Sequence, residues 1–248
     1  MTAEPVRIAL WSGPRNISTA MMRAFENRTD TAVIDEPFYA AYLTLSGIAH
    51  PLREETLARH ESDWRRVVQF LTGPVPHGRA IFYQKQMTHH MLPEIGRDWM
   101  ASCRNAFLIR APEAVLASYR ARREQFLPAD IGFAVQRELF EREADRLGHA
   151  PPVIDAEDVL RDPRAYLIAL CGALKIGFSE RMLHWPAGQR ATDGAWAPAW
   201  YDAVERSTGF ARPRSYPPLD ARLMAIADSE RPHYEFLARY KLQQGRHS

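Results

Sequence analysis

The stretch WSGPRNISTAMM, residues 11–22, directly follows an apolar run over residues 6–10. An apolar run, then a loop rich in glycine, proline and hydroxyl side chains, then a helical pattern predict a strand–loop–helix unit. In such a unit the loop N–H groups and the positive end of the helix form an anion site, usually for phosphate. We therefore predict an anion site over residues 13–19.

The loop differs from the Walker A pattern GxxxxGK[ST] of P-loop nucleotide-binding proteins. That pattern would need Gly, Lys and Ser or Thr at three positions that hold Ser18, Thr19 and Ala20. The lysine and the magnesium-binding hydroxyl are both absent, while Arg15 supplies a positive charge earlier in the loop. The loop therefore suits a phosphate group bound without a metal. A simpler alternative is an ordinary turn in which Ser18 and Thr19 cap the helix.

Short apolar runs alternate with helical patterns along the chain. The runs cover residues 6–11, 31–35, 80–85, 105–110 and 152–156. Helical spacing covers residues 17–27, 54–71, 112–124, 129–147, 199–206 and 219–240. Strands that are apolar on both faces and alternate with helices predict a three-layer α/β fold, with a parallel sheet and helices on both faces. We expect residues 1–248 to form one domain.

Composition and charge indicate which classes of partner and which cell compartment to expect. The chain has 248 residues, 46% of them hydrophobic and 25% charged, which is typical of a globular protein. The net charge of +2 is small and spread along the chain, so we expect no nucleic-acid partner. No run reaches the ~18 apolar residues of a membrane span, and the start of the sequence does not resemble a secretory leader. Cys103 and Cys171 lack metal-site or disulfide spacing, which favours the reducing cytoplasm. The oligomeric state is left open.

A second element follows the strand predicted over residues 105–110. The segment RAPEAVLAS places Arg110 at the strand end, Pro112 as a helix opener and Ser118 further along the helix. Arg110 offers two parallel N–H donors and Ser118 a hydroxyl, a pair suited to a second phosphate group. A surface arginine and an ordinary helical serine are the alternative.

Together the two elements resemble the sulfotransferase family of the P-loop superfamily. Its members carry a 5′-phosphosulfate loop such as PKSGTT or PRSGST, and a later RxPxxxxxS segment that binds the 3′-phosphate. The resemblance implies a P-loop sulfotransferase-like fold and 3′-phosphoadenosine 5′-phosphosulfate as sulfuryl donor, with no metal required. Arg110 and Ser118 then bind the 3′-phosphate. The phosphosulfate loop would comprise Pro14, Arg15, Asn16, Ile17, Ser18 and Thr19. Ile17 departs from the family, which usually has glycine at this position.

Two looser segments extend the resemblance. Residues 153–178 are similar to the family's strand, "EDLxxDP" and helix segment, and QRATDGAW, residues 189–196, is similar to its late GxxGxW loop. That loop closes on the 3′-phosphate in the family, which implies nucleotide contacts for Arg190, Gly194 and Trp196. We expect a lid or nucleotide-closing loop over residues 184–200.

The resemblance also implies the chemistry. Because a sulfuryl group carries less charge than a terminal phosphoryl group, side-chain cations can replace magnesium, and Arg15 and Lys85 are the candidates. Lys85 could equally be a surface lysine. Glu36 follows a predicted strand and matches a glutamate in some bacterial members, so it is the first candidate for the base. His89 and His90 are the alternatives; adjacent residues diverge in direction, so at most one should face the site.

We therefore predict a sulfotransferase-like enzyme that moves a sulfuryl group from the phosphosulfate nucleotide to a hydroxyl or amine of a small molecule. The alternatives are a small-molecule kinase or phosphotransferase with a degenerate P-loop, and a nucleotide-binding module without turnover.

Overall fold

The computed structural model describes residues 4–120 and 128–243 and contains a five-stranded, all-parallel sheet. The strand order is β2-β3-β1-β4-β5. The strands are β1 (Val6–Ser12), β2 (Thr31–Asp35), β3 (Ile81–Met87), β4 (Arg104–Ile109) and β5 (Val153–Asp155). All five strands lie where the apolar runs predicted them, which confirms the α/β fold class.

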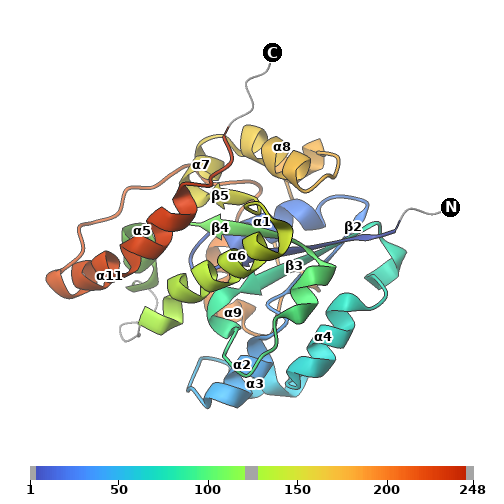
Figure 1. Ribbon diagram of the computed structural model, residues 1–248, viewed down its shortest axis with the longest axis horizontal. Coiled ribbons are helices and arrows are strands. Elements are labelled where there is room, and N and C mark those ends of the chain that lie inside the picture. The colour runs from blue at the N-terminus through green and yellow to red at the C-terminus, as the bar shows by residue number, and fades with distance from the viewer. Residues whose placement is uncertain (1–3, 121–127, 244–248) are drawn as a thin grey trace.

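Helices cover both faces of the sheet, as Figure 1 shows. One apolar core packs the sheet against α1 (Ser18–Glu26), α7 (Ala156–Arg161) and α8 (Pro163–Ala173). The other core packs it against α4 (Trp64–Thr72), α6 (Phe133–Leu147) and the end of α11 (Ala221–Ala238). The predicted three layers are therefore present.

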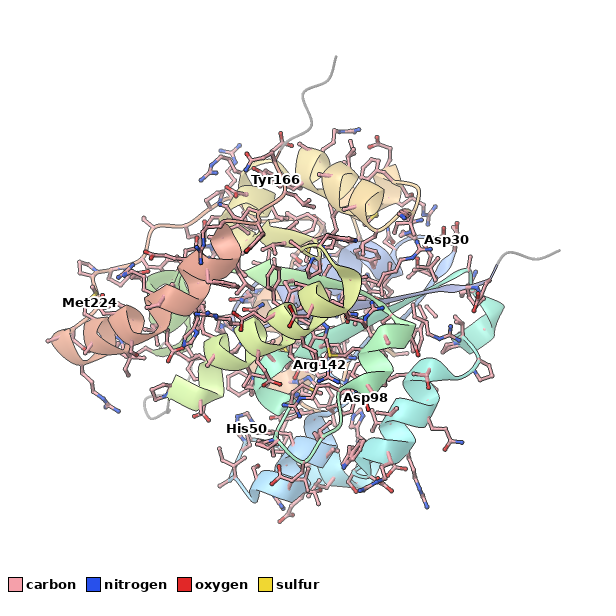
Figure 2. All side chains as sticks on the ribbon, in the orientation of Figure 1. Asp30, His50, Asp98, Arg142, Tyr166 and Met224 are labelled. Carbon is pink, nitrogen blue, oxygen red and sulfur yellow. The ribbon has the colours of Figure 1, made fainter. Side chains whose placement is uncertain are left out.

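The remaining helices surround these layers. A smaller apolar cluster joins α5 (Pro112–Arg120) to α11, and an aromatic cluster joins α2 (Tyr39–Ser46) to α9 (Ala197–Trp200). In the sticks view of Figure 2, Arg142 of α6 and Asp98 lie close together, and the ion pair between them spans 2.6 Å. The other helices are α3 (Arg53–Arg59), α10 (Asp202–Glu205) and the 3₁₀ turns η1 (Pro76–Gly78), η2 (Thr88–His90), η3 (Asp98–Ser102), η4 (Pro128–Ile131) and η5 (Glu180–Leu183).

Several predicted helices have different ends. The helix predicted over residues 54–71 is two helices, because His60 is extended and Asp63 caps α4 by accepting a hydrogen bond from the N–H of Arg65. The helix predicted over residues 129–147 begins only at Phe133, because Gly132 before it is left-handed (φ 69°). The helix predicted over residues 199–206 is interrupted at Tyr201, between α9 and α10. Residues 121–124 of the helix predicted over 112–124 lie outside the described residues.

The parallel register brings the strand ends together. Ser12 of β1 is paired with Met87 of β3 and with Leu108 of β4. The loop after β1 therefore lies between the segment after β3 and the segment after β4. In open α/β sheets, ligands bind at this carboxyl edge.

Candidate functional site

The loop after β1 leaves the N-terminus of α1 open. Ile17 is the N-cap residue and supplies no side-chain hydrogen bond, so the alternative in which Ser18 and Thr19 cap the helix is wrong. Within the two described ranges, no oxygen accepts a hydrogen bond from the backbone N–H of Ser18, Thr19 or Ala20. Free N–H groups at a helix N-terminus attract an anion.

Ile17 adopts the conformation that a glycine would adopt. Its φ of 57° and ψ of 14° are left-handed, which costs roughly 1–2 kcal/mol for a residue with a Cβ. Its side chain packs against the apolar core on the α1 face, which offsets that cost. Arg15, two residues earlier, has a similar φ of 62°. The departure from the family's glycine therefore preserves a glycine-like backbone at this position.

The two sequence motifs meet on the β4 side of this loop. Arg15 Nε donates to Ser118 Oγ of α5 at 3.0 Å. Arg110, which follows β4, donates from NH1 to the carbonyl oxygen of Arg15 at 2.8 Å. The alternative that Arg110 is a surface residue is wrong, because it is only 4% exposed. The structure thus brings Arg15, Arg110 and Ser118 together, and we call these three residues the arginine–serine group.

Two further side chains contact Arg110, and the sequence analysis did not single them out. Glu157 Oε1 accepts from Arg110 Nε at 3.0 Å and from NH2 at 2.6 Å. NH2 also donates to Tyr216 OH at 3.0 Å. Glu157 belongs to the EDVLRDP segment, in the first turn of α7, so its position was a usable signal. Tyr216 lies in an irregular segment between α10 and α11 that carries no such signal.

A second polar group lies at the ends of β2 and β3. Lys85 Nζ donates to Asp35 Oδ1 at 2.9 Å, to Glu36 Oε1 at 2.7 Å and to Tyr201 OH at 2.6 Å. The alternative of a surface lysine is wrong, because the Lys85 side chain is 1% exposed. Tyr201 OH in turn donates to Asp35 Oδ2 at 2.6 Å. We call Asp35, Glu36, Lys85 and Tyr201 the lysine group.

Burial and charge set the protonation of the lysine group. Burial alone would lower the pKa of Lys85, but Asp35 and Glu36 hold that pKa well above its usual range, so Lys85 is an ammonium. Burial raises the pKa of Glu36, and the charge of Asp35 raises it further, while Lys85 opposes both effects. A carboxylate with a raised pKa is a stronger proton acceptor once it is ionised.

His90 is buried beside Glu36. Its Nε2 lies 3.9 Å from Glu36 Oε2, and its ring stacks on Tyr39 (centroids 4.7 Å apart) and Tyr42 (4.9 Å). Neither ring nitrogen of His90 has a hydrogen-bond partner in the described parts of the chain, although the residue is 1% exposed. Burial lowers the pKa of His90 well below its usual value, so the ring is neutral. His89 instead packs edge-on against Tyr42, with centroids 5.6 Å apart.

The aromatic residues after Glu36 belong to two different apolar clusters. Phe38 belongs to the apolar core opposite α1, whereas Tyr39 and Tyr42 belong to the aromatic cluster around Trp196. His50, labelled in Figure 2, follows α2 and contacts the Tyr39 hydroxyl through its Nδ1.

The late loop lies against the lysine group. Gly194 donates its N–H to Asp35 Oδ2 at 3.1 Å, and the buried Trp196 donates from Nε1 to Tyr201 OH at 3.2 Å. Arg190 lies 3.8 Å from Glu26 at the end of α1. Two of the loop residues expected at the 3′-phosphate, Gly194 and Trp196, thus contact members of the lysine group.

Residues 4–120 and 128–243 contain neither a membrane-spanning helix nor a metal-binding cluster. No helix there combines the length and apolarity that crossing a bilayer demands. No cluster of three or more His, Cys, Asp or Glu side chains there is arranged to hold a metal ion.

Comparison with known proteins identifies the family. The family model described as "Sulfotransferase domain" matches residues 6–239. Among curated proteins, the chain is 38% identical over 221 residues to Branched-chain-amino-acid aminotransferase-like protein 1 of Arabidopsis thaliana, covering 87% of this chain and 38% of that protein. Protein 2 of the same name is 36% identical over 214 residues, covering 85% of this chain and 37% of that protein. The chain thus spans well under half the length of these two relatives.

Solved structures agree on the fold. The sulfotransferase domain from the curacin biosynthetic pathway gives a TM-score of 0.53 at 17% identity and covers 97% of this chain and 100% of that chain. A sulfotransferase from Alicyclobacillus acidocaldarius gives a TM-score of 0.57 at 12% identity and covers 97% and 98%. The family model extends over almost the whole sequence, and the chain therefore belongs to the sulfotransferase domain family.

Proposed function

We propose that this chain transfers a sulfuryl group from 3′-phosphoadenosine 5′-phosphosulfate to a hydroxyl or amine of a small molecule. One observation carries the proposal: the open N-terminus of α1 lies between the arginine–serine group and the lysine group. The strand order supports this placement, because β1 separates β4 from β3. A donor that carries phosphate at two positions fits the N-terminus of α1 and the arginine–serine group. An acceptor fits beside the lysine group.

On the donor side, the N–H groups at the start of α1 would hold the 5′-phosphosulfate. Arg110 and Ser118 would hold the 3′-phosphate, with Arg15 between the two phosphates. Glu157 already occupies two donors of Arg110, so the 3′-phosphate would share that guanidinium with a carboxylate. The loop over residues 184–200 would close the acceptor side, since Gly194 and Trp196 contact the lysine group.

On the acceptor side, the chemistry needs a base and a cation. Glu36 would accept the proton of the acceptor O–H or N–H as the new bond to sulfur forms. The bond between sulfur and the 5′-phosphate oxygen then breaks, and Lys85 and Arg15 would neutralise the charge left on that oxygen. His90 would contact the acceptor through its unpartnered ring nitrogens, between the walls formed by Tyr39 and Tyr42. His89 stays an alternative for the base.

Other functions are less well supported. A phosphotransferase with a degenerate P-loop would lack the Walker lysine and the magnesium-binding hydroxyl. A nucleotide-binding module without turnover would not need a buried lysine beside two carboxylates. The aminotransferase-like names belong to much longer proteins, and Lys85 is held as an ammonium, whereas a Schiff-base lysine must lose its proton.

We also propose that residues 1–248 fold as one domain, and that the protein acts in the cytoplasm without a nucleic-acid partner. Cys103 and Cys171 are both free and buried, which suits a reducing compartment.

The test is a thermal-shift series followed by a transfer assay. 3′-Phosphoadenosine 5′-phosphate should stabilise the protein without magnesium, by about 2.7 kcal/mol at 100 times its dissociation constant, and AMP should do so much less. The phosphosulfate nucleotide labelled with radioactive sulfur is then offered with phenols, aliphatic alcohols and amines. Labelled product supports the proposal. Stronger stabilisation by ATP with magnesium would favour the phosphotransferase, and binding with no transfer to any acceptor would favour the non-catalytic module.

A further inference from the structure

Asp35 accepts hydrogen bonds from three residues that belong to two separate segments of the chain. Oδ1 accepts from Lys85 of β3 at 2.9 Å. Oδ2 accepts from Tyr201 OH at 2.6 Å and from the Gly194 N–H at 3.1 Å. Asp35 ends β2, a rigid position, and is itself buried. One carboxylate thus joins the sheet, the lysine and the late loop.

Tyr201 closes the same network from the loop side. Its hydroxyl donates to Asp35 and accepts from Lys85 Nζ at 2.6 Å and from Trp196 Nε1 at 3.2 Å. Both Tyr201 and Trp196 are buried. The segment over residues 190–201 is therefore attached to the ammonium of Lys85 through the hydroxyl of Tyr201.

We propose that Asp35 and Tyr201 are positioning residues for sulfuryl transfer, which fix the Lys85 ammonium and hold the segment over residues 190–201 against the end of β2. This inference rests on the proposed function. The loop and the lysine are then positioned together, because Asp35 and Tyr201 contact both of them.

During the proposed reaction, Asp35 would keep the Lys85 ammonium paired with a negative charge. Before transfer, Lys85 is shared between two carboxylates, Asp35 and Glu36. When Glu36 takes the acceptor proton it becomes neutral, and its attraction for Lys85 falls. Asp35 has no proton to take in this step and stays the counter-ion, so the ammonium keeps its position while charge develops on the leaving oxygen.

The opposite edge of the sheet supplies a matched control. Tyr234 OH donates to Asp155 Oδ2 at 2.8 Å, and Lys241 Nζ lies 3.7 Å from the same carboxylate oxygen. Asp155 ends β5 as Asp35 ends β2. Tyr234→Phe therefore removes a similar tyrosine–aspartate hydrogen bond away from the lysine group.

The first experiment probes the attachment without any assay of transfer. The sequence contains three lysines, Lys85, Lys175 and Lys241, and Lys175 is exposed. A pulse of acetic anhydride followed by mass spectrometry compares acetylation of Lys85 with that of Lys175. Trypsin cleavage after Arg190, within the loop, is measured in parallel.

Tyr201→Phe is expected to increase Lys85 acetylation and cleavage after Arg190 by several-fold, and Tyr234→Phe is expected to change neither. Unchanged acetylation and cleavage in Tyr201→Phe would overturn the inference, since the hydroxyl would then hold neither the lysine nor the loop.

The second experiment probes the reaction in reverse, since both directions share one transition state. Para-nitrophenyl sulfate gives its sulfuryl group to 3′-phosphoadenosine 5′-phosphate, and released para-nitrophenol is followed by absorbance. Tyr201→Phe should lower kcat by about tenfold or more while KM for the bisphosphate stays within twofold, and Tyr234→Phe should match wild type. Asp35→Asn should lower kcat further. A kcat like that of wild type in Tyr201→Phe would overturn the positioning role.

Failure of the proposed function has a different signature. If wild type binds the bisphosphate but transfers nothing in either direction, the sulfotransferase function is wrong and the positioning role for sulfuryl transfer fails with it. The acetylation and cleavage results then still decide whether Asp35 and Tyr201 fix Lys85 and the loop.

Discussion

Lys85 Nζ and Glu36 Oε1 lie 2.7 Å apart at the ends of adjacent strands, in a position where the lysine is almost fully buried. Removing one partner of a buried ion pair costs several kcal/mol, because the other charge is left without compensation. A pair of this kind fits a site where charge moves during a reaction. The first prediction concerns its carboxylate.

Glu36→Gln should lower the turnover number by about 10²-fold or more while affinity for 3′-phosphoadenosine 5′-phosphate changes little. The amide keeps the size of the side chain and an acceptor oxygen for Lys85, but it cannot accept the acceptor's proton. Turnover is measured with any acceptor found in the transfer assay, and nucleotide affinity by calorimetry. His89→Asn and His90→Asn should each reduce turnover less.

The ranking of the three residues could be reversed. An active Glu36→Gln variant beside an inactive His90→Asn or His89→Asn variant would make that histidine the base. Glu36 would then serve to hold Lys85 and to orient the acceptor.

Arg110→Ala should remove most of the difference between 3′-phosphoadenosine 5′-phosphate and AMP in the thermal-shift series. Only the bisphosphate carries a 3′-phosphate for this guanidinium, so AMP should stabilise wild type and variant alike. Arg104→Ala is a control, since Arg104 donates to the carbonyls of Leu174 and Lys175, remote from the anion loop. Equal shifts by both nucleotides in the wild-type protein would contradict the 3′-phosphate assignment.

Glu157→Gln should strengthen bisphosphate binding by several-fold and leave AMP binding unchanged. The Glu157 carboxylate accepts from two nitrogens of Arg110 and would repel a 3′-phosphate brought to the same guanidinium. Without nucleotide the variant should melt at a lower temperature, because Arg110 loses its carboxylate partner. Asp158→Asn, on the same helix, is the control, since its partners are Arg161 and Lys241. Weaker bisphosphate binding in Glu157→Gln would instead mean that Glu157 orients Arg110 for the phosphate.

His90→Gln should make the protein less sensitive to acid. Burial lowers the pKa of His90 in the folded protein, whereas in the unfolded chain the imidazole titrates near 6.5. Below that pH the unfolded chain therefore binds one more proton, and the free energy of unfolding falls as pH falls, by at most ~1.4 kcal/mol per pH unit.

Urea unfolding of wild type and variant on both sides of this pH measures the effect. His149→Gln, at an exposed position, should keep the wild-type dependence. A His90→Gln variant with an unchanged dependence on pH would show that His90 is not held neutral.

The strands and the loop between β1 and α1 could be predicted from the sequence, because their signals are local. Buried parallel strands are apolar on both faces, so the runs that became β1 to β5 stand out without any tertiary information. The motifs containing Arg15, Arg110 and Ser118 were also local, and the sheet order then placed them at neighbouring strand ends.

The ends of the helices were predicted less well, because single residues decide them. Asp63 as an N-cap and Gly132 as a left-handed residue each interrupt a pattern that spacing alone extends. Aspartate is a preferred N-cap residue and glycine readily adopts a left-handed backbone, but the helical spacing of the apolar residues continued across both positions.

The sequence by itself determined the fold class, the family and the position of the loop between β1 and α1, since these depend on patterns within short segments. Only the tertiary structure decided that Lys85 is buried among Asp35, Glu36 and Tyr201, that Arg110 donates to Glu157, and that the loop of Gly194 and Trp196 contacts Asp35 and Tyr201. The physical reason is that burial and ion pairing depend on residues more than 40 positions apart: 50 between Lys85 and Asp35, 47 between Arg110 and Glu157, and 159 between Gly194 and Asp35. The apolar spacing within one segment cannot predict such contacts, because they form only when distant segments pack together.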